Sequence, residues 1–254
     1  VIPEIDWLQD QRDELQPISD LERRQFIRRI IEGLPQGHVL KRYNPGAKVD
    51  GRFQGGLYYE VSRMERLFLT IKAQYLNPET NQPDHQRLID ACERYLEALR
   101  QDPDYYYKRN TKTNKKGDFN ENKFNKVARK FELTIAAAKL YPEYEAQLAA
   151  NGRYDFADMI NWVNAAFKKD PDLLASYQER YQYYLVDEYQ DTNEVQNALL
   201  FNLLTPAYGA PDDRPNVMIV GDDDQAIYRF QGADITNMQQ FQQRYADTLN
   251  LFVL

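Results

Sequence analysis

The sequence contains very little cysteine and histidine, with only Cys92, His38 and His85 among its 254 residues. A lone cysteine excludes a disulfide framework and a metal site built from clustered cysteines. The two histidines are too few and too far apart in the sequence to suggest zinc. The fold must therefore be held by a hydrophobic core, for which a chain of this length is ample.

Long apolar runs are also absent. No stretch approaches the length that spans a membrane, and the residues after Val1 do not resemble a signal peptide. We therefore expect a cytoplasmic protein without a membrane partner. The formal net charge of −7 argues against binding nucleic acid through overall charge, so any such binding requires a local basic patch.

Two adjacent carboxylates, Asp187 and Glu188, follow an apolar run at 183–186. This run is aromatic and β-branched, which predicts a buried parallel strand. Ligands of open parallel sheets bind beyond the carboxyl ends of the strands. There, one carboxylate can hold Mg²⁺ and the other can orient a water molecule or take its proton. The alternative is a solvated acid pair at the end of a strand.

A second segment repeats this order about thirty residues later. Residues 216–233 contain a strand pattern, a glycine at Gly221, three acids and then a polar and aromatic loop. Together, 186–192 and 220–228 resemble motifs II and III of the UvrD/Rep-type superfamily 1 helicases. The resemblance implies an ATP-dependent DNA helicase that uses Mg²⁺.

The resemblance also implies roles for the residues near the nucleotide. Asp187 corresponds to the Mg²⁺ ligand, Glu188 to the residue that activates the attacking water, and Gln225 to the amide that contacts the γ-phosphate of ATP. Gln190 and Asp191 correspond to positions that link the two motifs. For Asp191, capping of the following helix is an equal alternative.

Aromatic positions in the second motif correspond to residues on which the family stacks bases of single-stranded DNA. These are Tyr228 and Phe230, although many members have Trp at the second position. Gln231 stands where many members have Arg, and Arg229 could supply that cation. Because any ring has a π-face, Phe230 should still stack. Packing of Phe230 in the core is the alternative.

A basic segment lies at 105–130, where nine Lys or Arg face two acids. Clustered bases beside tyrosines fit phosphate contacts and base stacking. The alternative is a solvated lysine-rich loop whose tyrosines pack inward. Given the helicase resemblance, we favour contacts with single-stranded or duplex DNA. The candidate residues are Lys108, Arg109, Lys115 and Lys116.

Apolar spacing predicts mostly helical structure before the first motif and alternating strands and helices around the two motifs. Ser19 and Asp155 are expected to cap helices, and Leu21 is expected to face inward. Residues 40–56 are expected to form a loop. The predicted helices are 19–33, 61–75, 85–99, 131–150, 171–181, 193–203 and 237–244, and a final strand is predicted at 249–254.

The predicted fold class is α/β, a partial RecA-like P-loop NTPase sheet with an inserted, mainly α-helical subdomain. The resemblance places the tail of the N-terminal part of motor domain 1A at 1–15. It places a helical insertion similar to subdomain 1B at 16–150, and the C-terminal part of domain 1A at 151–254.

The phosphate-binding pattern Gly-x-x-x-x-Gly-Lys-[Ser/Thr] is absent from the sequence. The chain also begins without Met and ends on an apolar run, so we expect an internal piece of a longer helicase that is inactive alone. The longer protein is expected to be a 3′-to-5′ helicase or single-stranded DNA translocase of repair or replication. The alternatives are the motor of a helicase-nuclease of recombinational repair and a DNA-binding module without catalysis.

Overall fold

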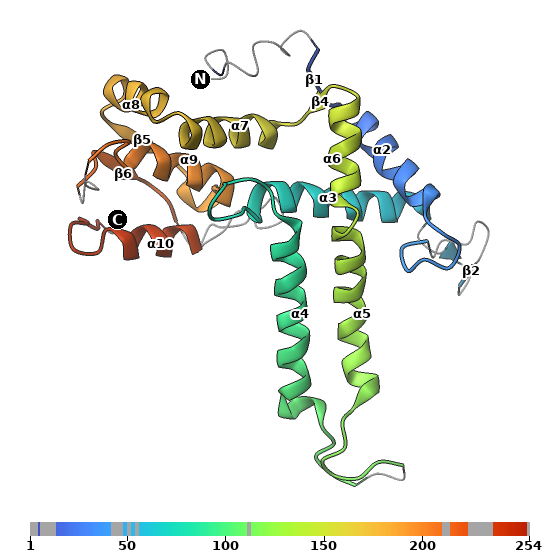
Figure 1. The fold of residues 1–254 in the computed structure, drawn as a ribbon. Coiled ribbons are helices and arrows are strands. Elements are labelled where there is room, and N and C mark those ends of the chain that lie inside the picture. Colours follow the sequence, from blue (N-terminus) through green and yellow to red (C-terminus); the bar gives the residue numbers. More distant parts are fainter. Residues whose placement is uncertain are drawn as a thin grey trace. The chain divides into compact units, whose positions relative to one another are not determined.

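The computed structural model describes most of the chain, which divides into two compact units (Figure 1). Unit 1 comprises 1–17, 69–83 and 152–254, and unit 2 comprises 18–68 and 84–151. The described residues are 5, 14–41, 48–49, 52–53, 56–110, 113–209, 214–222 and 236–252.

Unit 2 is built from helices. Helices α4 and α5 lie side by side as a long pair (Figure 1). A short antiparallel ribbon, β2 with β3, falls where the sequence predicted only a loop. The elements are α2 (Asp20–Gly33), β2 (Lys48–Val49), β3 (Arg52–Phe53), α3 (Leu57–Gln74, whose last residues belong to unit 1), α4 (His85–Gln101), η2 (Pro103–Tyr105), α5 (Glu121–Ala138) and α6 (Tyr141–Ala150).

Helix α2 begins where its capping residue predicts. Ser19 has an extended backbone, and its side chain accepts a hydrogen bond from the backbone N–H of Glu22. The predicted apolar stripe is buried at Phe26, Ile27, Ile30 and Ile31. Leu21, which was also expected to face inward, is 69% exposed. At about 100° per residue, it lies on the face opposite this stripe, so that prediction was wrong.

The predicted helix at 131–150 is two helices. Helix α5 ends at Ala138, and α6 begins at Tyr141 with Pro142 in its first turn. Proline lacks the N–H that a continuous helix would need at that position, so it starts a new helix instead. Since α5 already begins at Glu121, the C-terminal part of the basic segment 105–130 is helical.

Unit 1 is also mostly helical in its described residues, which include two small parallel sheets. Strand β1 pairs with β4, and β5 pairs with β6, which confirms that the strands around the two motifs are parallel. The elements are β1 (Gln16–Pro17), β4 (Arg153–Tyr154), α7 (Phe156–Lys169), α8 (Pro171–Arg180), β5 (Tyr184–Val186), η3 (Tyr189–Asp191), α9 (Glu194–Leu204), β6 (Val217–Ile219) and α10 (Thr236–Arg244).

The sheet formed by β5 and β6 is covered on one face by described residues. Tyr184 and Val186 pack against a cluster formed by Tyr189, Leu200, Leu204, Phe241 and Tyr245, from η3, α9, α10 and the turn after α10. On the other face, Leu185 is 80% exposed and Met218 is 59% exposed. The prediction of a fully buried strand is therefore wrong for β5, because no described element covers this second face.

The predicted final strand is also wrong in its described part. Residues 249–252 form no strand. The N–H groups of Thr248 and Leu249 both donate to the carbonyl of Tyr245, which makes a turn after α10. None of the described helices is long and apolar enough to cross a membrane.

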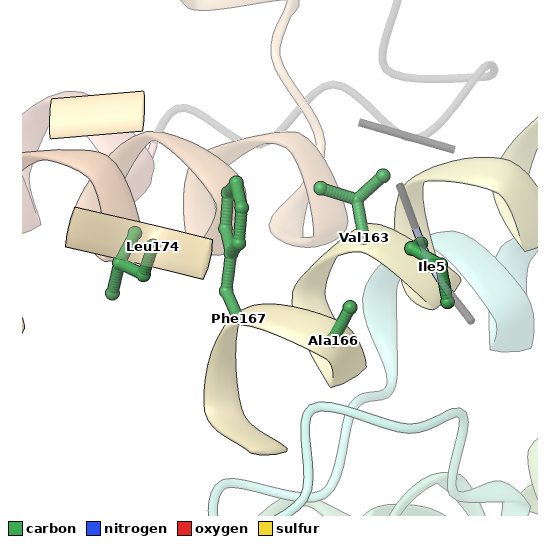
Figure 2. Packing of buried hydrophobic residues seen from close by; sticks show 5 residues of the cluster. All are labelled: Ile5, Val163, Ala166, Phe167 and Leu174. Atoms are coloured by element: carbon green, nitrogen blue, oxygen red, sulfur yellow. The ribbon is translucent and has the colours of Figure 1, made fainter. Parts of the chain in front are cut away.

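A second apolar cluster lies around α7. Figure 2 shows Val163, Ala166 and Phe167 of this helix with Ile5 and Leu174. Leu174 comes from α8, and the partly buried residues against the cluster include Leu199 of α9. This packing joins the helices that precede and follow β5, and so fixes the strand that carries the acid pair.

The N-terminal end of α7 carries a buried ion cluster. Asp155 caps the helix as predicted, in a capping box with Asp158. The fully buried ammonium of Lys72 lies 3.2 Å from Asp155 Oδ2 and 2.8 Å from Asp158 Oδ1. A charge taken out of water is costly unless it is paired, so this lysine ties the end of α3 to α7.

Replacing Lys72 with Met should destabilise the protein by about 3–5 kcal/mol, because the buried carboxylate of Asp155 and the part-buried carboxylate of Asp158 lose their cation. The measurement is chemical denaturation followed by circular dichroism. Lys168→Met is the control, since Lys168 is exposed and its ammonium donates to two backbone carbonyls, those of Pro78 and Glu79, rather than to a buried carboxylate. A loss below about 1 kcal/mol for the Lys72 variant would show that the cluster does not hold this region.

Candidate functional site

The acid pair lies where the chain leaves β5. Both Asp187 and Glu188 are exposed, and Asp187 Oδ1 accepts a hydrogen bond of 2.9 Å from the backbone N–H of Glu188. Glu188 has φ 50° and ψ 44°, a left-handed conformation that is uncommon for residues other than glycine. Such backbone strain is often found at functional sites. The sharp turn leaves both carboxylates at the carboxyl end of the strand.

The end of β6 lies beside this turn. The N–H of Val220 donates to the carbonyl of Val186, and the N–H of Tyr189 donates to the carbonyl of Val220. These bonds continue the parallel pairing beyond the two strands. They bring Gly221 and Asp222, the start of the second motif, next to the residues that follow the acid pair.

Gln190 connects the two motifs through its side chain. It is buried, its Nε2 donates to Glu188 Oε2 at 2.6 Å, and its Oε1 accepts from the N–H of Asp222 at 3.1 Å. The prediction that Gln190 links the motifs is confirmed. One buried amide thus holds both the carboxylate of Glu188 and the backbone of the second motif.

The capping role considered for Asp191 is wrong. Helix α9 is capped by Asn193, in a capping box with Gln196. Asp191 lies two residues earlier, in the single 3₁₀ turn η3, where it cannot reach the first turn of α9 in this way. The sequence Asn-Glu-Val-Gln at 193–196 contains the signal that would have identified the cap.

The donor set suits Mg²⁺ bound together with a phosphate. Among the described residues there is no group of three His, Cys, Asp or Glu side chains that could hold a metal by themselves. Magnesium commonly takes one or two carboxylates and completes its shell with water and substrate phosphates. Asp187 fits the carboxylate position, because it is exposed and is followed by a second acid.

Four of the predicted site residues lie outside the described residues. They belong to the second motif, after Asp222 and before α10, and are Gln225, Tyr228, Arg229 and Phe230. Their predicted contacts with the γ-phosphate and with DNA bases stay predictions.

The basic residues lie at the connection between α4 and α5, in unit 2. Tyr106 and Phe119 form an antiparallel bridge there. The N–H of Tyr107 donates to the carbonyl of Asp118, and the N–H of Gly117 donates to the carbonyl of Tyr107. We call residues 102–120 the basic hairpin.

In the basic hairpin, the described lysine side chains are exposed, whereas two of the tyrosine rings pack against the protein. Tyr105 is buried, and Tyr106 packs on Phe119 while its hydroxyl donates to the carbonyl of Arg100. These two tyrosines therefore pack inward, as the alternative interpretation expected. Their rings are used by the protein itself, so the basic hairpin offers mainly charge.

The exposed cations of the basic hairpin differ in their pairing. The ammonium of Lys108 lies 2.7 Å from Asp104, and this hydrogen bond and charge raise the pKa of Lys108. Lys115 and Lys116 are exposed, and the structure shows no ion pair for either ammonium among the described residues. Their backbone N–H groups are fixed by Asp118 and Asn110, which holds the two lysines at the end of the hairpin.

Comparison with known proteins identifies the class to which this fold and site belong. Residues 4–246 match the family described as UvrD/REP helicase N-terminal domain. Because the match covers nearly the whole chain, the chain belongs to the UvrD/REP helicase family, and this implies a RecA-like fold.

Three curated relatives illustrate this relation. The chain is 41% identical over 114 residues to a probable DNA helicase II homolog of Rickettsia felis, 36% over 125 residues to the ATP-dependent DNA helicase UvrD1 of Mycobacterium leprae, and 39% over 116 residues to the ATP-dependent DNA helicase PcrA of Staphylococcus aureus. These matches cover 45%, 48% and 46% of the chain. They span only 16%, 16% and 15% of the respective relatives.

Gly221→Ala should destabilise the protein by about 1–3 kcal/mol. A Cβ at this position would lie 2.6 Å from Gln190 Oε1, so the buried amide would have to move and lose a hydrogen bond. Chemical denaturation measures the change. Gly33→Ala is the control, because a Cβ there meets nothing within 4 Å. Equal stability of the Gly221 and Gly33 variants would contradict the tight contact.

Proposed function

We propose that this chain is part of an ATP-dependent 3′-to-5′ DNA helicase or single-stranded DNA translocase that acts in DNA repair or replication. The observation that carries the proposal is the link made by Gln190. It joins Glu188 to the start of the second motif at the carboxyl ends of two parallel strands. Membership of the UvrD/REP helicase family supports the same function.

The acid pair supplies the protein's part in ATP hydrolysis. Asp187 would hold Mg²⁺, which neutralises charge on the phosphates when it is bound. Glu188 would orient the attacking water and accept its proton, and the amide of Gln190 would keep its carboxylate in place. Gln225 would contact the γ-phosphate, since an amide can donate to a phosphate oxygen and accept from water.

Two separate regions would contact DNA. Tyr228 and Phe230 would stack on bases of single-stranded DNA, with Arg229 beside them. Lys115 and Lys116, together with Lys108 and Arg109, would contact phosphates, because these cations are exposed on the basic hairpin.

The proposed architecture is part of a RecA-like motor domain, with an inserted helical subdomain at 16–150 and motor residues on either side. The sequence lacks the glycine-rich loop whose lysine and hydroxyl hold the β- and γ-phosphates. We therefore propose that the 254 residues alone hydrolyse no ATP, and that activity belongs to a longer protein that contains this chain.

In that longer protein, Glu188→Gln should lower ATP turnover by about 10²–10⁴-fold, because the base that positions the water is lost. Binding of Mg²⁺-ATP should stay nearly unchanged. Phosphate release in the presence of single-stranded DNA measures the effect, and calorimetry measures ATP binding. Glu179→Gln, an exposed acid on α8, is the matched control. Turnover of the Glu188 variant within about threefold of wild type would remove Glu188 from this role.

Replacing Lys115 and Lys116 with Gln should flatten the salt dependence of DNA binding. For single-stranded DNA, the slope of log affinity against log salt should fall by up to about 1.4, since each phosphate contact contributes about 0.7. Fluorescence anisotropy at several salt concentrations measures this slope. The control pair is Lys168→Gln with Lys169→Gln, two exposed lysines on α7. An unchanged slope and affinity would mean that the basic hairpin does not touch DNA.

A further inference from the structure

A closed ring of buried and part-buried hydrogen bonds joins the turn after the acid pair to α9 and α10. The hydroxyl of Tyr189 donates to Asn197 Oδ1, and Asn197 Nδ2 donates to Asn237 Oδ1 at 3.2 Å. Asn237 Nδ2 donates to the carbonyl of Thr192 at 3.0 Å and lies 3.3 Å from its hydroxyl. The hydroxyl of Thr192 donates to the carbonyl of Tyr189 at 2.7 Å and so closes the ring.

Three of the four residues in the ring are buried, which makes their polar groups costly unless every one is satisfied. Tyr189 is fully buried, and Asn197 and Asn237 are 4% and 2% exposed. Burial raises the pKa of the Tyr189 phenol, so the hydroxyl stays protonated and remains a donor. An apolar side chain at Asn237 could fill the same space, but it could not fix the distance and direction between α10 and Thr192.

The position of Asn237 sets it apart from an ordinary capping asparagine. It is the second residue of α10, inside the helix and past the N-cap position from which an asparagine side chain bonds the first turn. Its side chain hydrogen-bonds Thr192 and Asn197, which lie 45 and 40 residues earlier in the chain. Its side chain therefore serves the contact between segments rather than the start of the helix.

The ring and the Gln190 link act on the same short turn. Gln190 holds the N–H of Asp222, where the second motif begins, and Asn237 holds Thr192 just after that motif ends. The turn 189–192 is thus bonded to the residues on both sides of the sequence 223–235. This turn also follows directly after Asp187 and Glu188.

We propose that Asn237 is a positioning residue that couples binding of single-stranded DNA to binding of ATP. The inference rests on the proposed function and adds a residue to it. A nucleotide at the acid pair favours one position of the turn 189–192, and Asn237 transmits that position to α10. By linkage, DNA bound by the residues before α10 then changes ATP affinity by the same factor as ATP changes DNA affinity.

The test is the ratio of single-stranded DNA affinities with and without a nonhydrolysable ATP analogue, measured on the longer protein that contains this chain. Coupling factors of this kind are typically about 5–150-fold. In the Asn237→Ala variant, the factor by which the analogue changes DNA affinity should be at least about fivefold smaller than in the wild type. Thr192→Val is a milder second variant, because it removes the hydroxyl of the ring and keeps the carbonyl.

The matched control is Asn164→Ala. Asn164 is fully buried in the same unit and bonds the carbonyl of Val195 and the amide of Asn202, away from the turn. Its variant should lose stability comparably and keep the wild-type ratio within about twofold. If Asn237→Ala and Thr192→Val also keep that ratio, Asn237 is only structural, and the inference is overturned.

The outcomes separate this inference from the function on which it rests. A wild-type protein that hydrolyses ATP on DNA but shows a ratio of one overturns the coupling and leaves the proposed function standing. A wild-type protein that binds neither the analogue nor DNA overturns both.

Discussion

The parallel pairing of β5 with β6 is the contact on which the candidate site depends. It places the carboxyl ends of two strands together, and the chain then continues the pairing through Val186, Tyr189 and Val220. Without this register, Gln190 could not reach both Glu188 and the N–H of Asp222. The surrounding helices support this pairing. Helices α9 and α10 cover one face of the sheet, and the packing of α7 with α8 positions the start of β5.

Unit 1 uses buried polar groups where geometry has to be specified. Lys72 meets two carboxylates, Gln190 uses both ends of its amide, and Asn237 closes a ring. Each group loses its hydrogen bonds to water on burial, and only well-placed protein partners can replace them. Apolar residues of the same size would have a lower desolvation cost, but they would not fix the positions of the segments relative to one another. The polar contacts therefore concentrate at the start of α7 and around the turn 189–192, next to the acid pair.

Local features of this fold could be predicted from the sequence, and distant ones could not. The capping residues Ser19 and Asp155 act within three residues of themselves, so their pattern is visible in the sequence. Leu185 was expected to be buried because its run is apolar, but burial depends on which elements cover the sheet. The acid pair stood out by its motif, whereas Lys72 finds its partners more than eighty residues away and carries no local signal.

The central claim is that Asp187 binds the metal of a bound nucleotide beside the turn that Gln190 holds. Its most direct test replaces Mg²⁺ with Fe²⁺ in the longer protein, with a nonhydrolysable ATP analogue, and maps backbone cleavage by metal-generated hydroxyl radicals. Cleavage is expected at 186–190 and at 220–222, and excess Mg²⁺ or omission of the analogue should abolish it. Nucleotide-dependent cleavage confined to other segments, with none at these two, would contradict the central claim.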